Sequence, residues 1–180
     1  LFTETLLTRD WRRLNSHPRT PLLNRATSGQ YAPGSTFKMV VGLAAIEAGV
    51  ISKNSLFNCS GDMELGNATF HCWRKGGHGM MNIISALEQS CDVFIYEVAL
   101  KTGIRKIKDM AHRLGLGDVT GIGLPGEKQG IIPSHEWKLA NQGGVWTPGE
   151  TVVSSIGQGY VLATPLQLAV MTARLANGKQ

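Results

Sequence analysis

The stretch YAPGSTFKMVVGLAAI, residues 31–46, decides the fold of this chain. The Pro-Gly pair near its start is a turn signal. The residues after that pair are apolar on nearly every side, which predicts a buried helix that ends near Gly49. Ser35 and Lys38 lie three residues apart where this helix begins, so their side chains share one face. A serine beside a lysine supplies the nucleophile and the base that covalent catalysis requires.

The spacing of Ser35 and Lys38 is weak evidence by itself, because such a pair occurs by chance about once in a chain of this size. The plain alternative is a capping serine followed by a solvated lysine. The surroundings favour the catalytic interpretation, because a lysine on a helix that is apolar all round must lose much of its water. Desolvation disfavours the ammonium form, and we therefore expect Lys38 to serve as a base.

A second polar motif, Ser90-Cys91-Asp92, follows 55 residues after Ser35. It interrupts two predicted apolar helices, over residues 82–89 and 93–101. Polar groups inside buried helices are costly unless they are used. Ser90 could pass a proton between Lys38 and a leaving amine, whereas the plain alternative is a simple turn between helices.

The remaining segments give a coarse organisation without internal repeats. We expect a polar approach segment over 1–30, an irregular insertion with a short hairpin over 51–80, a helix over 104–114, a loop-rich region over 117–150, and a last helix from Pro165 to about Ala176.

Composition indicates a folded protein and argues against some partners. The 180 residues are 42% hydrophobic and carry a net charge of +5. The positive side chains are scattered and not interleaved with aromatic ones, as a nucleic-acid platform would require, so we expect no nucleic-acid partner. No run approaches the ~20 apolar residues of a membrane helix.

Several motifs together resemble one family. The stretch 31–38 is similar to the active-site serine motif of class B penicillin-binding proteins, whose superfamily carries a serine-x-x-lysine signature. The sequence GQGY at 157–160, followed by ATPLQ at 163–167, looks like a segment typical of their transpeptidase domain. NRA at 24–26, GHG at 77–79 and GIGL at 121–124 fit the elongation-type members most specifically.

The resemblance implies an α/β fold of the penicillin-binding and serine β-lactamase-like transpeptidase class. That fold combines an antiparallel sheet and its packed helices with a mostly helical lobe. We expect residues 1–180 to be part of one such domain, namely the helical lobe with both serine motifs. The chain should then contain mostly helix and loop with few strands. We expect the N-terminal anchor, the pedestal and the C-terminal strands to be absent from it.

The resemblance also implies a peptidoglycan D,D-transpeptidase. Ser35 would attack the D-Ala-D-Ala end of a stem peptide, with Lys38 as base and with Ser90 and Asp92 in the second motif. An amine of a neighbouring stem peptide would then form the cross-link, and β-lactams would acylate the same serine. Family members are membrane-anchored at the periplasmic face of the bacterial inner membrane and work with a polytopic glycan polymerase. A serine β-lactamase and a penicillin-sensing receptor domain stay open as alternatives.

Two features depart from the family pattern. Asp92 stands where the second motif usually has Asn, and a carboxylate cannot donate the amide hydrogen bond. It would also favour the charged form of a nearby Lys38, so either Asp92 faces elsewhere or the proton relay differs. Lys101-Thr102-Gly103 has the letters of the family's third motif but ends a predicted helix, and we interpret it as a coincidence. We expect the true motif beyond Gln180, and therefore poor activity for this piece alone.

A metal site is the last sequence-based prediction. Three thiolates and one imidazole, from Cys59, Cys72, His78 and Cys91, would satisfy tetrahedral zinc. Some elongation-type penicillin-binding proteins resemble this in carrying zinc beside the second motif. His71 is a rival ligand. A disulfide between Cys59 and Cys72, or three buried thiols without a metal, are the alternatives.

Overall fold

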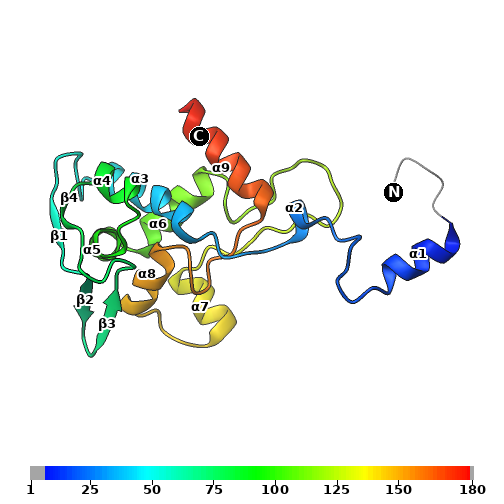
Figure 1. Ribbon diagram of the computed structural model, residues 1–180, viewed down its shortest axis with the longest axis horizontal. Helices are drawn as coiled ribbons and strands as arrows, with labels where there is room; N and C mark the ends of the chain where they lie inside the picture. Colours follow the sequence, from blue (N-terminus) through cyan, green and yellow to red (C-terminus); the bar gives the residue numbers. More distant parts are fainter. Residues whose placement is uncertain (1–6, 179–180) are drawn as a thin grey trace.

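The computed structural model describes residues 7–178, and helices make up most of its regular structure (Figure 1). The helices are α1 (Thr8–Asn15), α2 (Arg25–Ser28), the 3₁₀ turn η1 (Gly34–Phe37), α3 (Lys38–Glu47), α4 (Ile83–Glu88), α5 (Asp92–Thr102), α6 (Ile104–Arg113), α7 (His135–Gln142), α8 (Pro148–Ser155) and α9 (Pro165–Asn177). The strands are β1 (Phe57–Cys59), β2 (Asp62–Leu65), β3 (Ala68–His71) and β4 (Gly79–Met81).

The core forms around α3 and α5. Helix α3 packs against α5 and α6, and α5 also packs against α8 (Figure 1). Both central helices carry apolar residues on most faces, as a helix enclosed by neighbours requires. Val40, Phe94 and Ile107 are among the core residues that solvent does not reach. The predicted buried helix after residue 37 and the helices near 82–89, 93–101, 104–114 and 165–176 are all present.

The four strands form two small antiparallel pairs within the predicted insertion. Strand β2 pairs with β3, with Leu65 opposite Ala68, so the two-residue turn Gly66-Asn67 closes the predicted hairpin. Strand β1 pairs with β4 outside that hairpin, with Cys59 opposite Gly79. The insertion is therefore more regular than predicted, although strands remain few, as expected.

The loop-rich prediction for residues 117–150 is wrong in part, because α7 and the beginning of α8 lie there. Both helices are only eight residues long and are fixed by their caps. The side chain of Ser134 accepts a hydrogen bond from the Trp137 amide, and Thr147 forms a capping box with Glu150. Such short helices owe their stability to caps and packing, which hydrophobic periodicity does not reveal.

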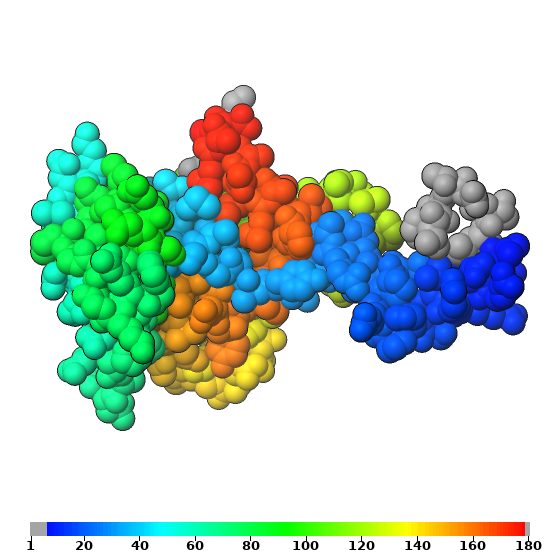
Figure 2. Space-filling view, viewed as in Figure 1, coloured from blue at the N-terminus to red at the C-terminus, as the bar shows by residue number. Residues whose placement is uncertain are grey.

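The predicted polar approach segment over residues 1–30 contains two short helices, α1 and α2, which the sequence pattern did not indicate. Helix α1 lies in an arm that extends away from the body, at the blue end of Figure 2. None of its residues is buried, and Asp10 pairs with Arg13 at 3.4 Å across one turn. Within residues 7–178, no helix combines the length and apolar character that crossing a membrane demands.

The turn that carries Ser35 is fixed by a close approach of two backbones. The Gly34 amide donates to the Gly157 carbonyl at 3.0 Å. Gly157 has a φ of +68°, and a Cβ atom there would overlap the backbone of Gly34 and meet the side chain of Phe37. Tyr31 and Ala163 exchange backbone hydrogen bonds beside this contact. The conformation of Gly157 therefore sets the position of the η1 turn.

Replacing Gly157 by alanine should destabilise the complete protein and slow any reaction at Ser35. Gly143 is the matched control, because its φ is +67° but a Cβ there would meet no neighbouring atom. We expect Gly143→Ala to cost about 1 kcal/mol of unfolding free energy from the left-handed conformation alone. Gly157→Ala should cost about 1–3 kcal/mol more, because the added methyl has no space. Denaturant titration of both variants measures the difference, and equal losses would contradict the packing argument.

Candidate active site

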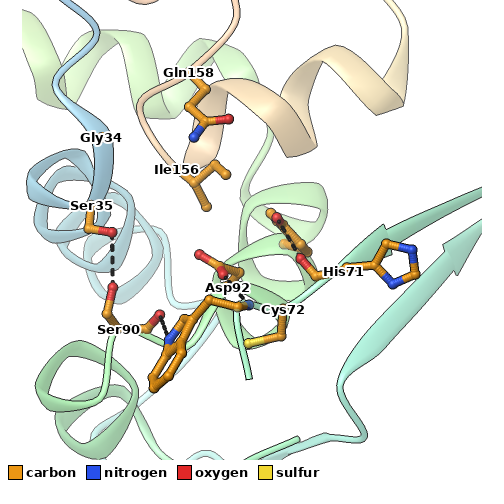
Figure 3. A pocket seen from close by; sticks show the side chains of 10 residues that line it. Gly34, Ser35, His71, Cys72, Ser90, Asp92, Ile156 and Gln158 are labelled. Atoms are coloured by element: carbon orange, nitrogen blue, oxygen red, sulfur yellow. Dashed lines mark hydrogen bonds between the residues drawn. The ribbon is translucent and has the colours of Figure 1, made fainter. Parts of the chain in front are cut away.

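A cavity of about 740 Å³ opens beside the η1 turn (Figure 3). It lies where this turn, the end of β3, the start of α5 and the loop after α8 meet. Its lining residues are Gly34, Ser35, His71, Cys72, Trp73, Ser90, Asp92, Tyr96, Ile156 and Gln158.

Lys38 lies buried next to the second motif. Only 1% of the residue is exposed, and its Nζ donates to the Ser90 carbonyl at 2.8 Å, to Ser90 Oγ at 2.9 Å and to Asp92 Oδ1 at 2.6 Å. A buried ammonium loses several kcal/mol of hydration, and paired acceptors must replace that water. Three acceptors match the three donors of the ammonium group, so Lys38 is held in one position.

Ser35 connects to Lys38 through Ser90. The hydroxyl of Ser35 lies on the exposed surface of the cavity, and Ser90 Oγ donates to Ser35 Oγ at 2.9 Å (Figure 3). No direct hydrogen bond joins Lys38 to Ser35 in the described chain, so the expected direct contact is replaced by a relay. Lys38 turns toward the second motif because its three acceptors lie there.

Ser90 adopts a backbone conformation that usually belongs to glycine. Its φ is +52°, and it follows directly after the last turn of α4. The Cys91 amide donates to the Ala86 carbonyl at 2.8 Å and the Ser90 amide to the Leu87 carbonyl at 3.2 Å. This pair of bonds is the Schellman motif, which places its left-handed residue where Ser90 stands. A non-glycine residue in this conformation carries strain of about 1–2 kcal/mol, which the surrounding contacts must offset.

Asp92 faces the site, so the alternative that it points elsewhere is wrong. Its Oδ1 accepts from Lys38, and its Oδ2 accepts from the Trp73 amide at 3.0 Å. Asp92 also begins α5, where the positive end of the helix dipole favours a carboxylate. The second motif therefore neutralises the buried lysine in addition to contacting the first serine.

The third-motif letters at 101–103 lie outside the cavity lining. Lys101 and Thr102 end α5, and Gly103 caps it with a φ of +83°. The Lys101 ammonium lies 4.4 Å from the centre of the Phe57 ring, and Thr102 Oγ1 donates to the Val98 carbonyl. These contacts are those of a helix end, in agreement with the interpretation of this match as a coincidence.

Sequence reasoning missed several residues that line the cavity. Tyr96, Ile156 and Gln158 face it from α5 and from the loop after α8, and Trp73 borders it from the insertion. The resemblance of the segment 157–160 to the family was the one signal for Gln158. Trp73 has no periodic pattern around it, and its position follows only from the hairpins.

The predicted metal ligands lie together, and one of them, Cys91, belongs to the second motif. One ligand atom from each of Cys59, Cys72, His78 and Cys91 lies within 4.8 Å of all the others. His78 Nδ1 is 3.6 Å from Cys59 Sγ and 3.5 Å from Cys72 Sγ. Sulfur and nitrogen ligands of tetrahedral zinc are about 3.6 Å apart, so these separations fit the ion. His71 does not belong to the cluster, and no disulfide joins Cys59 to Cys72 in the described chain.

The protonation of this cluster follows from its burial. Burial and the neighbouring thiols of Cys59 and Cys72 raise the pKa of Cys91 to about 12. Burial, together with the positive charge of Arg74, lowers the pKa of His78, so a neutral imidazole is available as a ligand. The buried Nε2 of His78 has no hydrogen-bond partner among the described residues. A metal ion held here would displace thiol protons, so its binding would depend on pH.

Comparisons with known proteins agree on one family. A family model described as penicillin binding protein transpeptidase domain matches residues 5–180. Peptidoglycan D,D-transpeptidase MrdA from Escherichia coli (strain K12) is 38% identical over 179 residues, which cover 98% of this chain and 28% of that protein. MrdA from Acinetobacter baumannii is 38% identical over 183 residues, covering 98% and 27%. The chain thus spans little more than a quarter of these relatives.

Solved structures support the same conclusion about the fold. PBP2 from Pseudomonas aeruginosa in complex with WCK 5153 matches with a TM-score of 0.90 and 39% identity, covering 96% of this chain and 40% of that one. PBP2 from Helicobacter pylori matches with a TM-score of 0.91 and 38% identity, covering 96% and 33%. The penicillin G acyl-enzyme complex of penicillin-binding protein A from M. tuberculosis matches with a TM-score of 0.79 and 26% identity, covering 94% and 38%. The predicted penicillin-binding transpeptidase fold is confirmed.

Two substitutions of Ser90 should separate its backbone strain from its hydroxyl. Ser90→Ala and Ser90→Gly both remove Oγ, which contacts Lys38 and Ser35. Only glycine adopts a φ near +52° without strain, so Ser90→Gly should be more stable than Ser90→Ala by about 1 kcal/mol. Thermal or denaturant unfolding measures this difference. Both variants should lose reactivity at Ser35 to a similar extent, and equal stabilities would contradict the strain at this position.

Proposed function

Since this chain belongs to the penicillin-binding protein transpeptidase family, we propose that it supplies the acylating centre of a peptidoglycan D,D-transpeptidase. One observation carries the proposal, namely the continuous hydrogen-bonded relay from Ser35 Oγ through Ser90 Oγ to the buried Lys38 Nζ. Ser35, at one end of the relay, lines the cavity, where a substrate carbonyl can approach its hydroxyl. The names of the relatives support the same reaction class.

The first half of the reaction forms an acyl-enzyme. Lys38 Nζ lies 2.6 Å from Asp92 Oδ1, so in this reaction the carboxylate takes one proton from the ammonium group and leaves a neutral amine. Ser90 then passes the Ser35 proton to that amine while Ser35 Oγ bonds to the penultimate D-Ala carbonyl carbon. The peptide bond breaks, and the terminal D-Ala amine takes a proton from Lys38 through Ser90.

The second half of the reaction runs the same proton transfers and carbonyl attack in the reverse order, with a different amine as the attacking group. The amino group of a neighbouring stem peptide attacks the ester carbonyl and gives a proton to Lys38 through Ser90. The ester bond breaks, the cross-link forms, and Ser35 recovers its proton. A β-lactam follows the first half alone, because its opened ring remains attached and keeps the acyl-enzyme from an incoming amine. The carboxylate of Asp92 gives the relay a proton site that an asparagine would not.

The setting of this reaction is part of the proposal. We place the complete protein at the periplasmic face of the bacterial inner membrane, where it acts on stem peptides beside a polytopic glycan polymerase. A structural relative, PBP2 from Helicobacter pylori, is described in a complex with MreC. That complex supports the view that this family works within a larger assembly.

Penicillin should acylate Ser35 in the complete protein, and Ser35→Ala should abolish the adduct because the hydroxyl that Ser90 contacts would be gone. Intact mass measurement after incubation with penicillin gives the result. Ser16→Ala, an exposed serine that caps α1, is the control and should react as the wild type does.

The lifetime of the adduct distinguishes the related activities. A long-lived adduct at Ser35 supports the transpeptidase, whereas rapid release of hydrolysed penicillin would indicate a β-lactamase. An adduct that persists in Ser35→Ala would refute the proposed nucleophile.

We also propose that Cys59, Cys72, His78 and Cys91 hold a structural zinc ion. Support comes from the ligand separations and from the donor set, because three thiols and an imidazole suit zinc. The ion would link the insertion to Cys91, which stands between Ser90 and Asp92. Its contribution would be to folding, of order 10 kcal/mol in small sites, and not to a chemical step.

Removing zinc should loosen both the insertion and the second motif. Chelation of the complete protein, or Cys72→Ser, should lower the midpoint of thermal unfolding and also slow acylation by penicillin. Returning zinc to the chelated protein should restore both properties, whereas Cys72→Ser should not recover. Elemental analysis of protein that was never chelated decides the matter independently of activity. A preparation without bound metal, or with Cys59 bonded to Cys72, would end this hypothesis.

A further inference from the structure

The geometry points to Trp73 as a positioning residue that holds Ser90 and Asp92 in the second motif from the solvent side. This inference rests on the proposed function, and it assigns Trp73 to the same site. The indole Nε1 donates to the Gln89 carbonyl and to the Ser90 carbonyl, both at 3.1 Å. The backbone amide of Trp73 donates to Asp92 Oδ2 at 3.0 Å. Trp73 therefore binds residues that precede Cys91 in the sequence and the residue that follows it.

The end of α4 needs these donors. The last carbonyls of a helix lack partners within the helix, and they must find them elsewhere. The Schellman bonds from Ser90 and Cys91 use the carbonyls of Leu87 and Ala86. The carbonyls of Gln89 and Ser90 lie beyond those bonds, and the indole supplies a shared donor to them. The indole hydrogen bond thus fixes the backbone of Ser90, the strained residue, where the chain leaves α4.

Lys38 and Trp73 both bind Ser90 and Asp92, Lys38 from the protein interior and Trp73 from the solvent-exposed side. Lys38 is buried and binds the Ser90 carbonyl, Ser90 Oγ and Asp92 Oδ1. Trp73 is 64% exposed and binds the Ser90 carbonyl and the other oxygen of Asp92. Both carboxylate oxygens of Asp92 therefore have a partner, and the Ser90 carbonyl has two. Figure 3 shows Ser90 directed at Ser35 from this position.

Burial does not account for Trp73. A tryptophan contributes mainly through the apolar area that it removes from water, and most of Trp73 stays in contact with water. Its ring makes an edge contact with His78 at a centroid distance of 5.3 Å. The insertion carries this residue back over the second motif, since Trp73 comes immediately after Cys72 at the end of β3. What the Trp73 side chain adds at this place is its indole N–H donor.

Trp73→Phe tests the indole donor, because it keeps an aromatic ring and the backbone amide while removing Nε1–H. We expect acylation of Ser35 by penicillin, measured as the rate constant at saturating penicillin, to fall about three- to tenfold, the range for loss of one hydrogen bond. The dissociation constant of the initial penicillin complex should change less than twofold. Trp11→Phe, at an exposed tryptophan on α1, is the matched control and should leave both quantities unchanged.

An isosteric replacement separates the hydrogen bond from the shape of the ring. Benzothienylalanine at position 73 keeps the bicyclic ring but has sulfur in place of Nε1–H. The same fall in acylation rate as in Trp73→Phe supports the inference. Wild-type acylation in the benzothienyl variant would overturn it, because the ring alone would then account for the effect of Trp73→Phe.

Hydrogen exchange tests the inference without reference to activity. In Trp73→Phe, the amides of Ser90 and Cys91 should exchange at least threefold faster, while those of α6 stay unchanged. If penicillin fails to acylate the wild type at Ser35, the proposed function fails, and the exchange measurement still decides the role of Trp73. If the wild type is acylated but Trp73→Phe matches it in acylation and exchange, the inference fails and the proposed function stands.

Discussion

The structure depends on one buried charge. Lys38 lies inside the packing of α3 against α5, where an unpaired ammonium would cost several kcal/mol. All of its acceptors belong to Ser90 and Asp92, at the junction of α4 and α5. The helices must therefore meet so that this junction faces the first turn of α3. The same requirement brings the Ser35 turn beside the second motif, because Ser35 precedes Lys38 by three residues, about one turn of the 3₁₀ segment.

The two pairs of strands also contribute residues to the junction of α4 and α5. They return the chain from α3 to α4 by a path that passes over the second motif, and they bring Cys72 and Trp73 to it. Cys91 is fully buried among these residues, while its neighbours on both sides face the cavity. The left-handed backbone of Ser90 makes this alternation possible, because it turns the chain sharply after α4. The strain is offset by contacts from both the helical core and the insertion.

The sequence predicted the parts of this site that follow from spacing. The Ser35–Lys38 interval, the polar break at 90–92 and the grouping of thiols each reflect a local pattern, and the structure brings those residues together. The sequence predicted Ser90 as a proton carrier between Lys38 and a leaving amine. It did not predict that Ser90 stands between Lys38 and Ser35, because the direction of Lys38 depends on acceptors 52 and 54 residues away. Helices α7 and α8 were missed since caps define them, and Trp73 was missed since hydrogen bonding and not burial fixes its place.

Asp92 shows how a departure from a family pattern can be accommodated. An asparagine would leave the buried Lys38 with its positive charge, whereas Asp92 makes the pair neutral overall. Neutrality favours folding, because an uncompensated buried cation is strongly destabilising. Asp92 Oδ1 also lies 2.6 Å from Lys38 Nζ, where it competes with Ser90 as a hydrogen-bond acceptor for the lysine. Ser90 becomes more important for this reason, since among the residues that the structure describes it is the one that hydrogen-bonds both to Lys38 and to the Ser35 hydroxyl. The groups act as a unit, and the loss of any one should remove most of what they do together.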